Sequence, residues 1–110
     1  MLNKSRRLRL NRDFERVFSK GRSINGNLFK LRVLKNNLNY SRFAVVVSTK
    51  VSKRAVVRNR IRRRVWSVIA KIVYTLPSGL DVVFMAIPTA SNADFLSNQS
   101  EIMYLTKRLS

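Results

Sequence analysis

Apolar side chains near the start of the chain recur at the spacing of a helix. Phe14, Val17 and Phe18 fall at positions i, i+3 and i+4, which share one face of an α-helix. Acidic residues lie in the first turn of this segment, where the helix dipole favours them. We therefore expect a short helix over residues 11–20, with Asn11 as its N-cap.

Two strand-like patterns follow this helix. Residues 27–35 alternate apolar with basic side chains, which is the period of a half-buried strand. The side chains that point one way are Phe29, Leu31 and Val33, and those that point the other way are Lys30 and Arg32. Residues 40–48 contain the uninterrupted run Ala-Val-Val-Val, which favours a more central position in the sheet. A loop is expected over 21–27, with a further short strand near 22–26 left open.

The longest helical pattern covers residues 54–75. Its apolar stripe consists of Val57, Ile61, Val65, Val68, Ile69, Ile72 and Val73. A turn with Pro and Gly leads to a third apolar strand over 80–88. A last helix is expected after it, with Ser91 or Asn92 as its N-cap. The core face of that helix would hold Phe95, Ile102, Leu105 and Leu109.

These elements form one domain over residues 1–110. Their order is α–β–β–α–β–α, and no repeat or linker divides the chain. Helices packed on one face of a small sheet would give a two-layer α/β sandwich. The longest apolar stretch, at 65–76, contains Lys71 and is too short to cross a bilayer. Since no apolar targeting segment is visible either, we expect a soluble, cytoplasmic protein.

The composition separates this chain from a disordered basic tail. Hydrophobic residues make up 45% of its 110 residues, enough for one small core. Yet 23 Lys and Arg stand against five Asp and Glu, which gives a formal net charge of +18. Such charge repels itself in a compact fold. A polyanionic partner would offset that repulsion. Nucleic acid is the first candidate and an anionic membrane surface the alternative.

The residue types exclude several kinds of chemistry. The chain has no cysteine and no histidine, so thiolate zinc sites, cysteine nucleophiles and histidine bases are ruled out. The five acids are scattered along the chain: Asp13, Glu15, Asp81, Asp94 and Glu101. A nuclease would need clustered carboxylates or histidines to hold its metal ions. We therefore expect no catalytic residue and no metal site in the protein itself.

Arginines concentrate in the stretch Arg-Asn-Arg-Ile-Arg-Arg-Arg-Val, residues 58–65. At 100° per residue, Lys53 and two of these arginines, Arg60 and Arg63, fall opposite the apolar stripe and face solvent. In contrast, Arg58 and Arg62 fall close to the stripe, on the side that faces the sheet. A merely solvated run would place its charges away from the core. We therefore expect these two arginines to snorkel or to line a groove beside the sheet.

For three side chains the sequence permits more than one interpretation. Asn59 could contact a phosphate or sugar, fix a neighbouring arginine, or be an ordinary polar residue of the helix. Phe14 and Phe18 could belong to the core or act as stacking platforms, since aromatic side chains beside cations bind single-stranded RNA.

Two motifs in this order resemble the bacterial ribonuclease P protein component. Residues 53–65, Lys-Arg-Ala-Val-Val-Arg-Asn-Arg-Ile-Arg-Arg-Arg-Val, follow a strand that ends in Ser-Thr-Lys, as in that family. The segment Arg-Leu-Asn-Arg-Asp-Phe-Glu-Arg-Val-Phe-Ser-Lys-Gly, at 9–21, resembles the family's start. The resemblance covers nearly the whole chain.

The resemblance implies a more specific fold than the pattern alone. The family's order is αβββαβα, an α+β two-layer sandwich with a four-stranded sheet and a left-handed crossover through the basic helix. It is similar to the second domain of ribosomal protein S5. The hydrophobic pattern alone predicts three strands, which is one fewer than the four strands of the family.

The resemblance also implies two binding surfaces. Contacts with the catalytic RNA would come from Lys50, Lys53, Arg54, Arg58, Asn59, Arg60, Arg62 and Arg63. A cleft between the first helix and the sheet would take the 5′ leader of precursor tRNA, through Phe14, Phe18, Phe29, Arg32, Ser48 and Lys50. Arg32 stands at a position that is often aromatic in relatives, which suggests a phosphate contact in place of stacking.

The function implied is that of a non-catalytic subunit of a ribonucleoprotein endonuclease, which removes 5′ leaders from precursor tRNAs. The RNA subunit would carry out hydrolysis through bound Mg²⁺, and the protein alone would bind no cofactor. Its partners would be the catalytic RNA and the leader, with no membrane and no obligatory protein partner. The alternative is a small basic ribosome-associated or RNA-chaperone protein.

Overall fold

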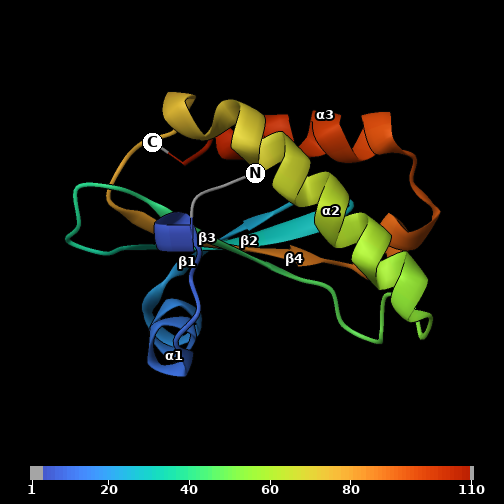
Figure 1. Cartoon of the computed structure of the whole chain (residues 1–110), viewed down its shortest axis with the longest axis horizontal. Helices are drawn as coiled ribbons and strands as arrows, with labels where there is room; N and C mark the ends of the chain where they lie inside the picture. Colours follow the sequence, from blue (N-terminus) through green and yellow to red (C-terminus); the bar gives the residue numbers. More distant parts are fainter. Residues whose placement is uncertain (1–3, 110) are drawn as a thin grey trace.

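A computed structural model describes residues 4–109 (Figure 1). Its helices and strands are α1 (Asn11–Lys20), β1 (Arg22–Asn25), β2 (Phe29–Lys35), β3 (Arg42–Val46), α2 (Ala55–Ile72), β4 (Leu80–Ala86) and α3 (Phe95–Thr106). Short 3₁₀ turns lie at Lys4–Arg6, Val73–Thr75 and Pro88–Asn92. The order αβββαβα and the α+β class implied by the resemblance are confirmed.

The four strands form one mixed sheet in the order β1-β2-β4-β3. β2 pairs antiparallel with both β1 and β4, whereas β3 pairs parallel with β4. A parallel pair needs a crossover connection, and α2 provides it between β3 and β4. The basic helix is thus fixed at both ends by neighbouring strands.

Helices α2 and α3 cover one face of the sheet, and α1 lies on the other (Figure 1). The main core lies between the sheet and α2 and α3, and includes Phe29, Phe43 and Phe84. A smaller cluster under α1 is made of Leu8, Val17, Ala44 and Val83. The expectation that the helices lie on one face therefore holds for α2 and α3 but not for α1.

The strand count and strand positions differ from the pattern. Residues Arg22–Asn25, expected as a loop with a short strand near 22–26 left open, form β1, in which only Ile24 is buried. The alternative of a further strand is therefore the correct one. A single apolar residue cannot show alternation. The central position expected for residues 40–48 is wrong, because β3 lies at the sheet edge. Its apolar run reflects helices on both faces, and the N-terminal segment covers its edge through the hydrogen bond from Leu8 N to Phe43 O, 2.8 Å.

Both expected N-caps are wrong. Leu10 precedes α1, so Asn11 is the first helical residue and makes no cap. Asp94 caps α3, while Ser91 and Asn92 belong to a 3₁₀ turn. The long helix also ends at Ile72 and continues only as a 3₁₀ turn. Polar residues cluster at both helix starts, and the pattern does not say which of them has the extended backbone that a cap needs.

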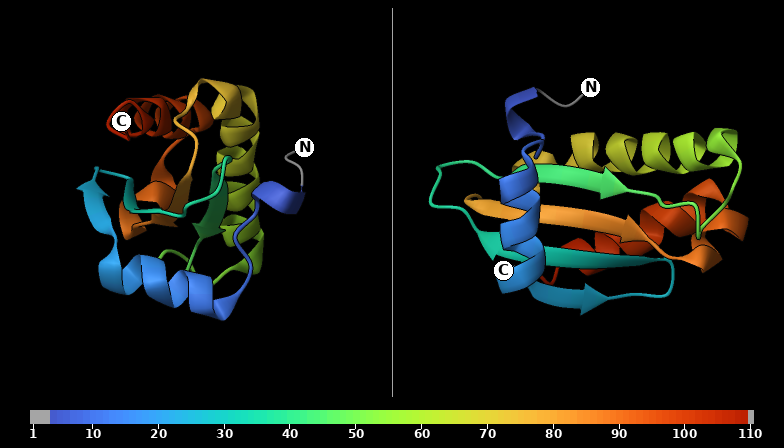
Figure 2. Two further views of the ribbon diagram at one scale, coloured as in Figure 1. Left: turned by 90° about the vertical axis from the view of Figure 1, so that its left-hand side faces the viewer. Right: turned by 90° about the horizontal axis from the view of Figure 1, so that it is seen from below.

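Helix α1 crosses the strands near one end of the sheet and leaves the other end uncovered (Figure 2, right). The uncovered end holds the start of β2 and the last residues of β3 and β4. The connection from β3 to α2 lies beside it (Figure 2, right). The fold thereby places an open sheet surface next to the start of the basic helix.

Candidate nucleic-acid interface

The first half of α2 and the connection before it carry a concentrated positive charge. We call the eight residues predicted to contact RNA the basic ridge: Lys50, Lys53, Arg54, Arg58, Asn59, Arg60, Arg62 and Arg63. The apolar stripe of α2 is buried at Val57, Ile61 and Val65. Lys53, Arg60 and Arg63 are exposed, as expected from their place opposite that stripe. The helix therefore presents charge outward along its length.

Arg58 and Arg62 lie on the sheet side of α2, as predicted from their angular position. Both are half-buried. Arg58 Nη1 donates to the carbonyl oxygen of Ser52 at 2.9 Å, and Arg62 Nη1 donates to that of Val47 at 3.4 Å. Arg62 Nη2 also donates to Asn59 Oδ1. The two arginines thus tie α2 to the β3–α2 connection, and Asn59 orients one of them.

No acid neutralises the basic ridge among the residues that the structure describes. There, the ion pairs of lysine and arginine involve only Arg16 and Arg42. Like charges at helical spacing destabilise an isolated helix by about 0.2–0.5 kcal/mol per pair. The phosphates of a polyanion would convert this repulsion into attraction.

The uncovered end of the sheet forms a second candidate surface. Lys30, Met85 and Val46 are neighbours across β2, β4 and β3, and they face the α1 side. Phe14 and Phe18 of α1 are one turn apart; Phe14 packs on the cluster under α1, and Phe18 is 42% exposed. We call these five residues the open sheet surface. It combines aromatic and apolar side chains with one cation.

Phe29 does not belong to this surface. Its side chain is fully buried in the main core, on the face covered by α2 and α3. Its assignment to the leader cleft was therefore wrong. The alternation of β2 already separates Phe29 from Lys30 and Arg32. Ser48 and Lys50, from the same predicted set, are exposed and follow the last residue of β3 closely in the chain.

Arg32 lies on the α1 side, but its guanidinium is engaged within the protein. Its Nη1 donates to Ser23 Oγ at 2.6 Å, and its Nη2 donates to the carbonyl oxygen of Phe18 at 2.5 Å. A cation that binds the last carbonyls of a helix stabilises the helix end. Arg32 thus holds the end of α1 that carries Phe18, a role that the sequence did not indicate.

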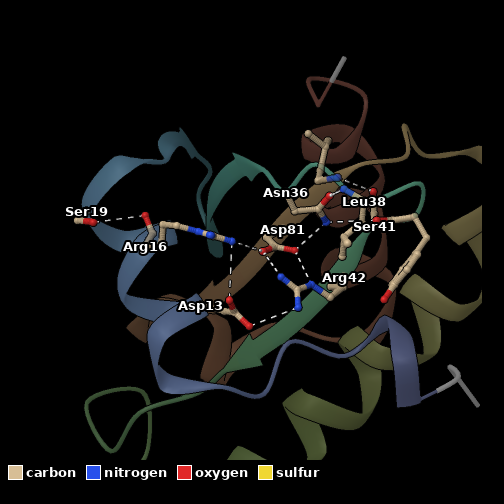
Figure 3. Close-up of polar contacts among 10 residues, drawn as sticks. Asp13, Arg16, Ser19, Asn36, Leu38, Ser41, Arg42 and Asp81 are labelled. Carbon is tan, nitrogen blue, oxygen red and sulfur yellow. Dashed lines mark hydrogen bonds and ion pairs between the residues drawn. The ribbon is translucent and has the colours of Figure 1, made fainter.

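A buried polar network beneath α1 fixes the helix on the sheet (Figure 3). Asp81 is fully buried and accepts hydrogen bonds from Arg42 Nε at 2.9 Å, Arg42 Nη2 at 2.7 Å and Asn36 Nδ2 at 2.9 Å. Arg42 Nη1 also contacts Asp13 Oδ2 at 3.3 Å. Hydrogen bonding to Asp81, with the negative charges of Asp81 and Asp13, raises the pKa of Arg42. One signal of this network is visible in the sequence, namely an aspartate inside an otherwise apolar strand.

Two further acids, Glu101 and Asp94, serve structural roles as well. Glu101 of α3 accepts hydrogen bonds from the backbone amides of Asn27, Leu28 and Phe29, at 2.8, 2.6 and 2.7 Å. Asp94 Oδ1 accepts one from the Ser97 amide at 2.8 Å. Within residues 4–109, no three acidic side chains gather where they could hold a metal ion. Over the same residues, no helix has the length and apolar character needed to span a membrane.

Comparisons of sequence point to one family. The model of the ribonuclease P family matches residues 2–110. The ribonuclease P protein component of Pseudanabaena sp. is 36% identical over 96 residues, which cover 86% of this chain and 83% of the relative. That of Thermotoga petrophila is 35% identical over 107 residues, which cover 94% and 91%.

Solved structures agree with the sequence comparisons. The ribonuclease P protein from Thermotoga maritima, in complex with 1-(4-fluorophenyl)-2-thiourea, matches with a TM-score of 0.88 and 32% identity, over 94% of this chain and all of that one. The Staphylococcus aureus ribonuclease P protein matches with a TM-score of 0.87 and 26% identity, over 96% and 98%. The fold, the basic helix and these matches together show that the chain belongs to the ribonuclease P protein family.

Proposed function

We propose that this chain is the protein subunit of a ribonucleoprotein ribonuclease P. It binds the catalytic RNA and the 5′ leader of precursor tRNA, and the RNA performs the hydrolysis that removes the leader. The family membership supports the assembly with RNA. The observation that carries the proposal is the basic ridge, whose cations have no acidic partner within the described part of the chain.

The basic ridge is suited to a folded RNA. Its exposed cations, Arg60 and Arg63, extend along a rigid helix, and each can meet a phosphate without losing an internal contact. Arg58 and Arg62 keep their backbone bonds and still have donors on each planar guanidinium. Phosphate contacts of this kind fix position and carry little base information. We assign this ridge to the RNA subunit.

The open sheet surface is suited to a single strand. Phe18 and Phe14 offer rings on which bases can stack, and Lys30 offers a cation for the backbone between them. Met85 adds an adaptable apolar floor. Such a surface accepts most base sequences, as a subunit that meets many leaders requires. We assign it to the 5′ leader, with Ser48 and Lys50 at its edge.

The protein acts through charge and position. Two RNAs that approach each other carry like charge, and a chain with a net charge of +18 between them screens the repulsion. Mg²⁺, bound by the RNA, supplies the metal chemistry of hydrolysis. We expect the protein to lower the Mg²⁺ concentration at which the RNA works. It would act in the cytoplasm, with RNA as its only obligatory partner.

Reconstitution tests this function. The full chain is added to ribonuclease P RNA and a labelled precursor at limiting Mg²⁺, with the chain alone and the RNA alone as controls. The expected result is leader removal only when both are present. Cleavage by the protein alone, or RNA activity unchanged by the protein, would contradict the proposal. Accelerated RNA annealing without restored cleavage would favour the RNA-chaperone alternative.

A further inference from the structure

A groove runs along α2 beyond the basic ridge. It lies between one side of the helix and the N-terminal segment, which the left view of Figure 2 shows beside α2. The residues that line it are Arg7, Asn59, Arg62, Arg63, Trp66, Ser67, Ala70 and Lys71, and its volume is about 680 Å³. The helical members recur every three or four positions, so they form one continuous stripe.

An arginine stacked on an indole forms the wall of this groove. The guanidinium carbon of Arg7 lies 4.5 Å from the centre of the Trp66 ring. The segment that carries Arg7 is anchored on β3 by the bond from Leu8 N to Phe43 O. Trp66 packs in turn against the main core. The stack is therefore held on both sides, and the guanidinium plane forms a prepared platform.

Three of the cations that line the groove have no acidic or hydrogen-bonding partner among the described residues. Within residues 4–109, the side chains of Arg7, Arg63 and Lys71 make no ion pair and no hydrogen bond. No lining residue is acidic. A groove with this charge favours an anion, and the groove is too long and open for one small ion. Its aromatic wall favours a ligand that also has a flat ring.

We propose that this groove binds an unpaired nucleotide of the RNA subunit. The base stacks on the Arg7–Trp66 pair, and the flanking phosphates meet Arg63 and Lys71. Unpaired bases are held in this manner on arginine planes and aromatic rings. The inference rests on the proposed function. The groove shares Asn59, Arg62 and Arg63 with the basic ridge, so the strand that enters it continues the RNA bound there.

The only tryptophan of the chain provides a direct probe, since Trp66 fluorescence reports on this groove alone. Acrylamide quenching is measured for the wild-type chain, free and then saturated with ribonuclease P RNA. Protection of Trp66 on binding the RNA subunit is the expected result. Protection that appears only after a precursor with a leader is added would identify the leader as the occupant and overturn the assignment.

Variants separate stacking from charge. Trp66→Leu should weaken binding of the RNA subunit about tenfold at every salt concentration, with an unchanged salt slope. Arg7→Gln removes part of the stacking platform and should weaken binding in the same way. Lys71→Gln removes a phosphate contact and should lower the slope of log K against log salt by roughly 0.7–0.9. The matched control is Arg6→Gln with Tyr74→Leu. Arg6 also lies over an aromatic ring, 5.4 Å from the centre of Tyr74, but outside the groove.

The outcomes distinguish this inference from the proposed function. If wild-type protein binds the RNA subunit and restores cleavage while Trp66 remains equally open to acrylamide, only the groove assignment fails. If the wild-type chain does not bind that RNA, the proposed function is wrong, and the groove assignment that rests on it is wrong as well. Equal losses in the groove variants and in the control pair would show a general charge or folding effect and would also overturn the assignment.

Discussion

Glu101 reaches from α3 to the β1–β2 turn, where its carboxylate accepts the backbone amides of Asn27, Leu28 and Phe29. Gly26 is required beside it, because a Cβ there would lie 2.9 Å from the backbone oxygen of Phe29 and 2.9 Å from Glu101 Oε2. One side chain thus fixes the start of β2, which carries Lys30 on the open sheet surface.

Removal of this carboxylate should cost stability. We predict that Glu101→Ala lowers the free energy of unfolding by about 2 kcal/mol, because backbone donors that are partly buried lose their acceptor. Glu101→Gln, which keeps one acceptor oxygen, should lose less. Urea unfolding followed by circular dichroism measures both. Equal stability of Glu101→Ala and wild type would show that water replaces the carboxylate without loss.

Asp94 gives α3 a dependence on pH. Hydrogen bonds from Ser97 hold the pKa of Asp94 below its ordinary value. The unfolded chain therefore binds the proton more readily, and the stability that the cap contributes is complete above the ordinary pKa and is lost as the pH falls through the folded-state pKa. We predict that the difference in melting temperature between wild type and Asp94→Ala is largest at neutral pH and falls in acid to that between Asp94→Asn and Asp94→Ala.

The control for this effect is Asp94→Asn, which keeps a capping oxygen but does not titrate. The difference between Asp94→Asn and Asp94→Ala should be independent of pH over the same range. A difference between wild type and Asp94→Ala that stayed constant into strong acid would show that the charged carboxylate adds nothing to the cap.

At the scale of single residues, the sequence predicted which way a side chain points better than it predicted which groups that side chain contacts. The angle of Arg58 and Arg62 on the helix was enough to place them on the sheet side. The partners of Arg32 and Glu101 depend on which strand and helix meet in space, and no local pattern contains that information. Arg32 could therefore be read as a phosphate ligand, although its guanidinium holds the end of α1.

Among the elements, α2 carries the largest share of the proposed function. Replacement of Arg58 or Arg62 by Ala should weaken binding of the RNA subunit and lower the salt slope by up to roughly 0.7–0.9 for each arginine. Filter binding at several salt concentrations measures the slope. Lys107→Ala, an exposed cation at the end of α3, is the control of equal charge. A slope equal to that of wild type would remove both arginines from the interface.

Helix α1 carries the aromatic part of the open sheet surface. We predict that Phe14→Leu and Phe18→Leu keep most of the fold, because the volume and apolar character are similar. They should reduce the affinity of the holoenzyme for precursors with long leaders, by about five- to tenfold for each stacked base lost. Tyr104→Leu on α3, an exposed aromatic far from this surface in the chain, is the control.

Leaderless tRNA distinguishes stacking from a general effect. The two phenylalanine variants should bind it as well as the wild-type holoenzyme does. An equal loss of affinity for leaderless and leader-containing tRNA would show that the open sheet surface does not contact the leader.

The long periodic elements were predicted from the sequence, whereas β1 was only left open and β3 was predicted as a strand but in the wrong position in the sheet. The stripe of α2 and the alternation of β2 extend over enough residues to be recognised. β1 has only Ile24 as a buried residue, so its strand character comes from pairing with β2. The apolar run of β3 indicated burial on two faces but could not show that the strand lies at an edge, because an N-terminal segment covers that edge.

Across the whole molecule, the acidic residues that hold the fold together are different from the basic residues that give the surface its charge. Two acids, Asp13 and Asp81, join Arg16 and Arg42 beneath α1, and Glu101 and Asp94 hold backbone amides. Few negative charges remain to balance the cations at the surface. A net charge of +18 is thus a property of the exterior. It predicted a polyanionic partner before any fold was known, but it could not separate the two surfaces.

The two proposed surfaces lie on opposite sides of the sheet, and this arrangement can be measured directly. The chain has no cysteine, so a single introduced cysteine can carry an iron chelate that cleaves nearby RNA. Val56 is 65% exposed beside the basic ridge, and Val46 is 37% exposed on the open sheet surface. The variants are Val56→Cys and Val46→Cys, with Tyr104→Cys as the control.

In the reconstituted complex with precursor tRNA, the chelate at position 56 should cut the RNA subunit, and the chelate at position 46 should cut the 5′ leader. The control at position 104 should cut neither strongly. Cuts in the leader from position 56, or in the RNA subunit alone from position 46, would contradict the account.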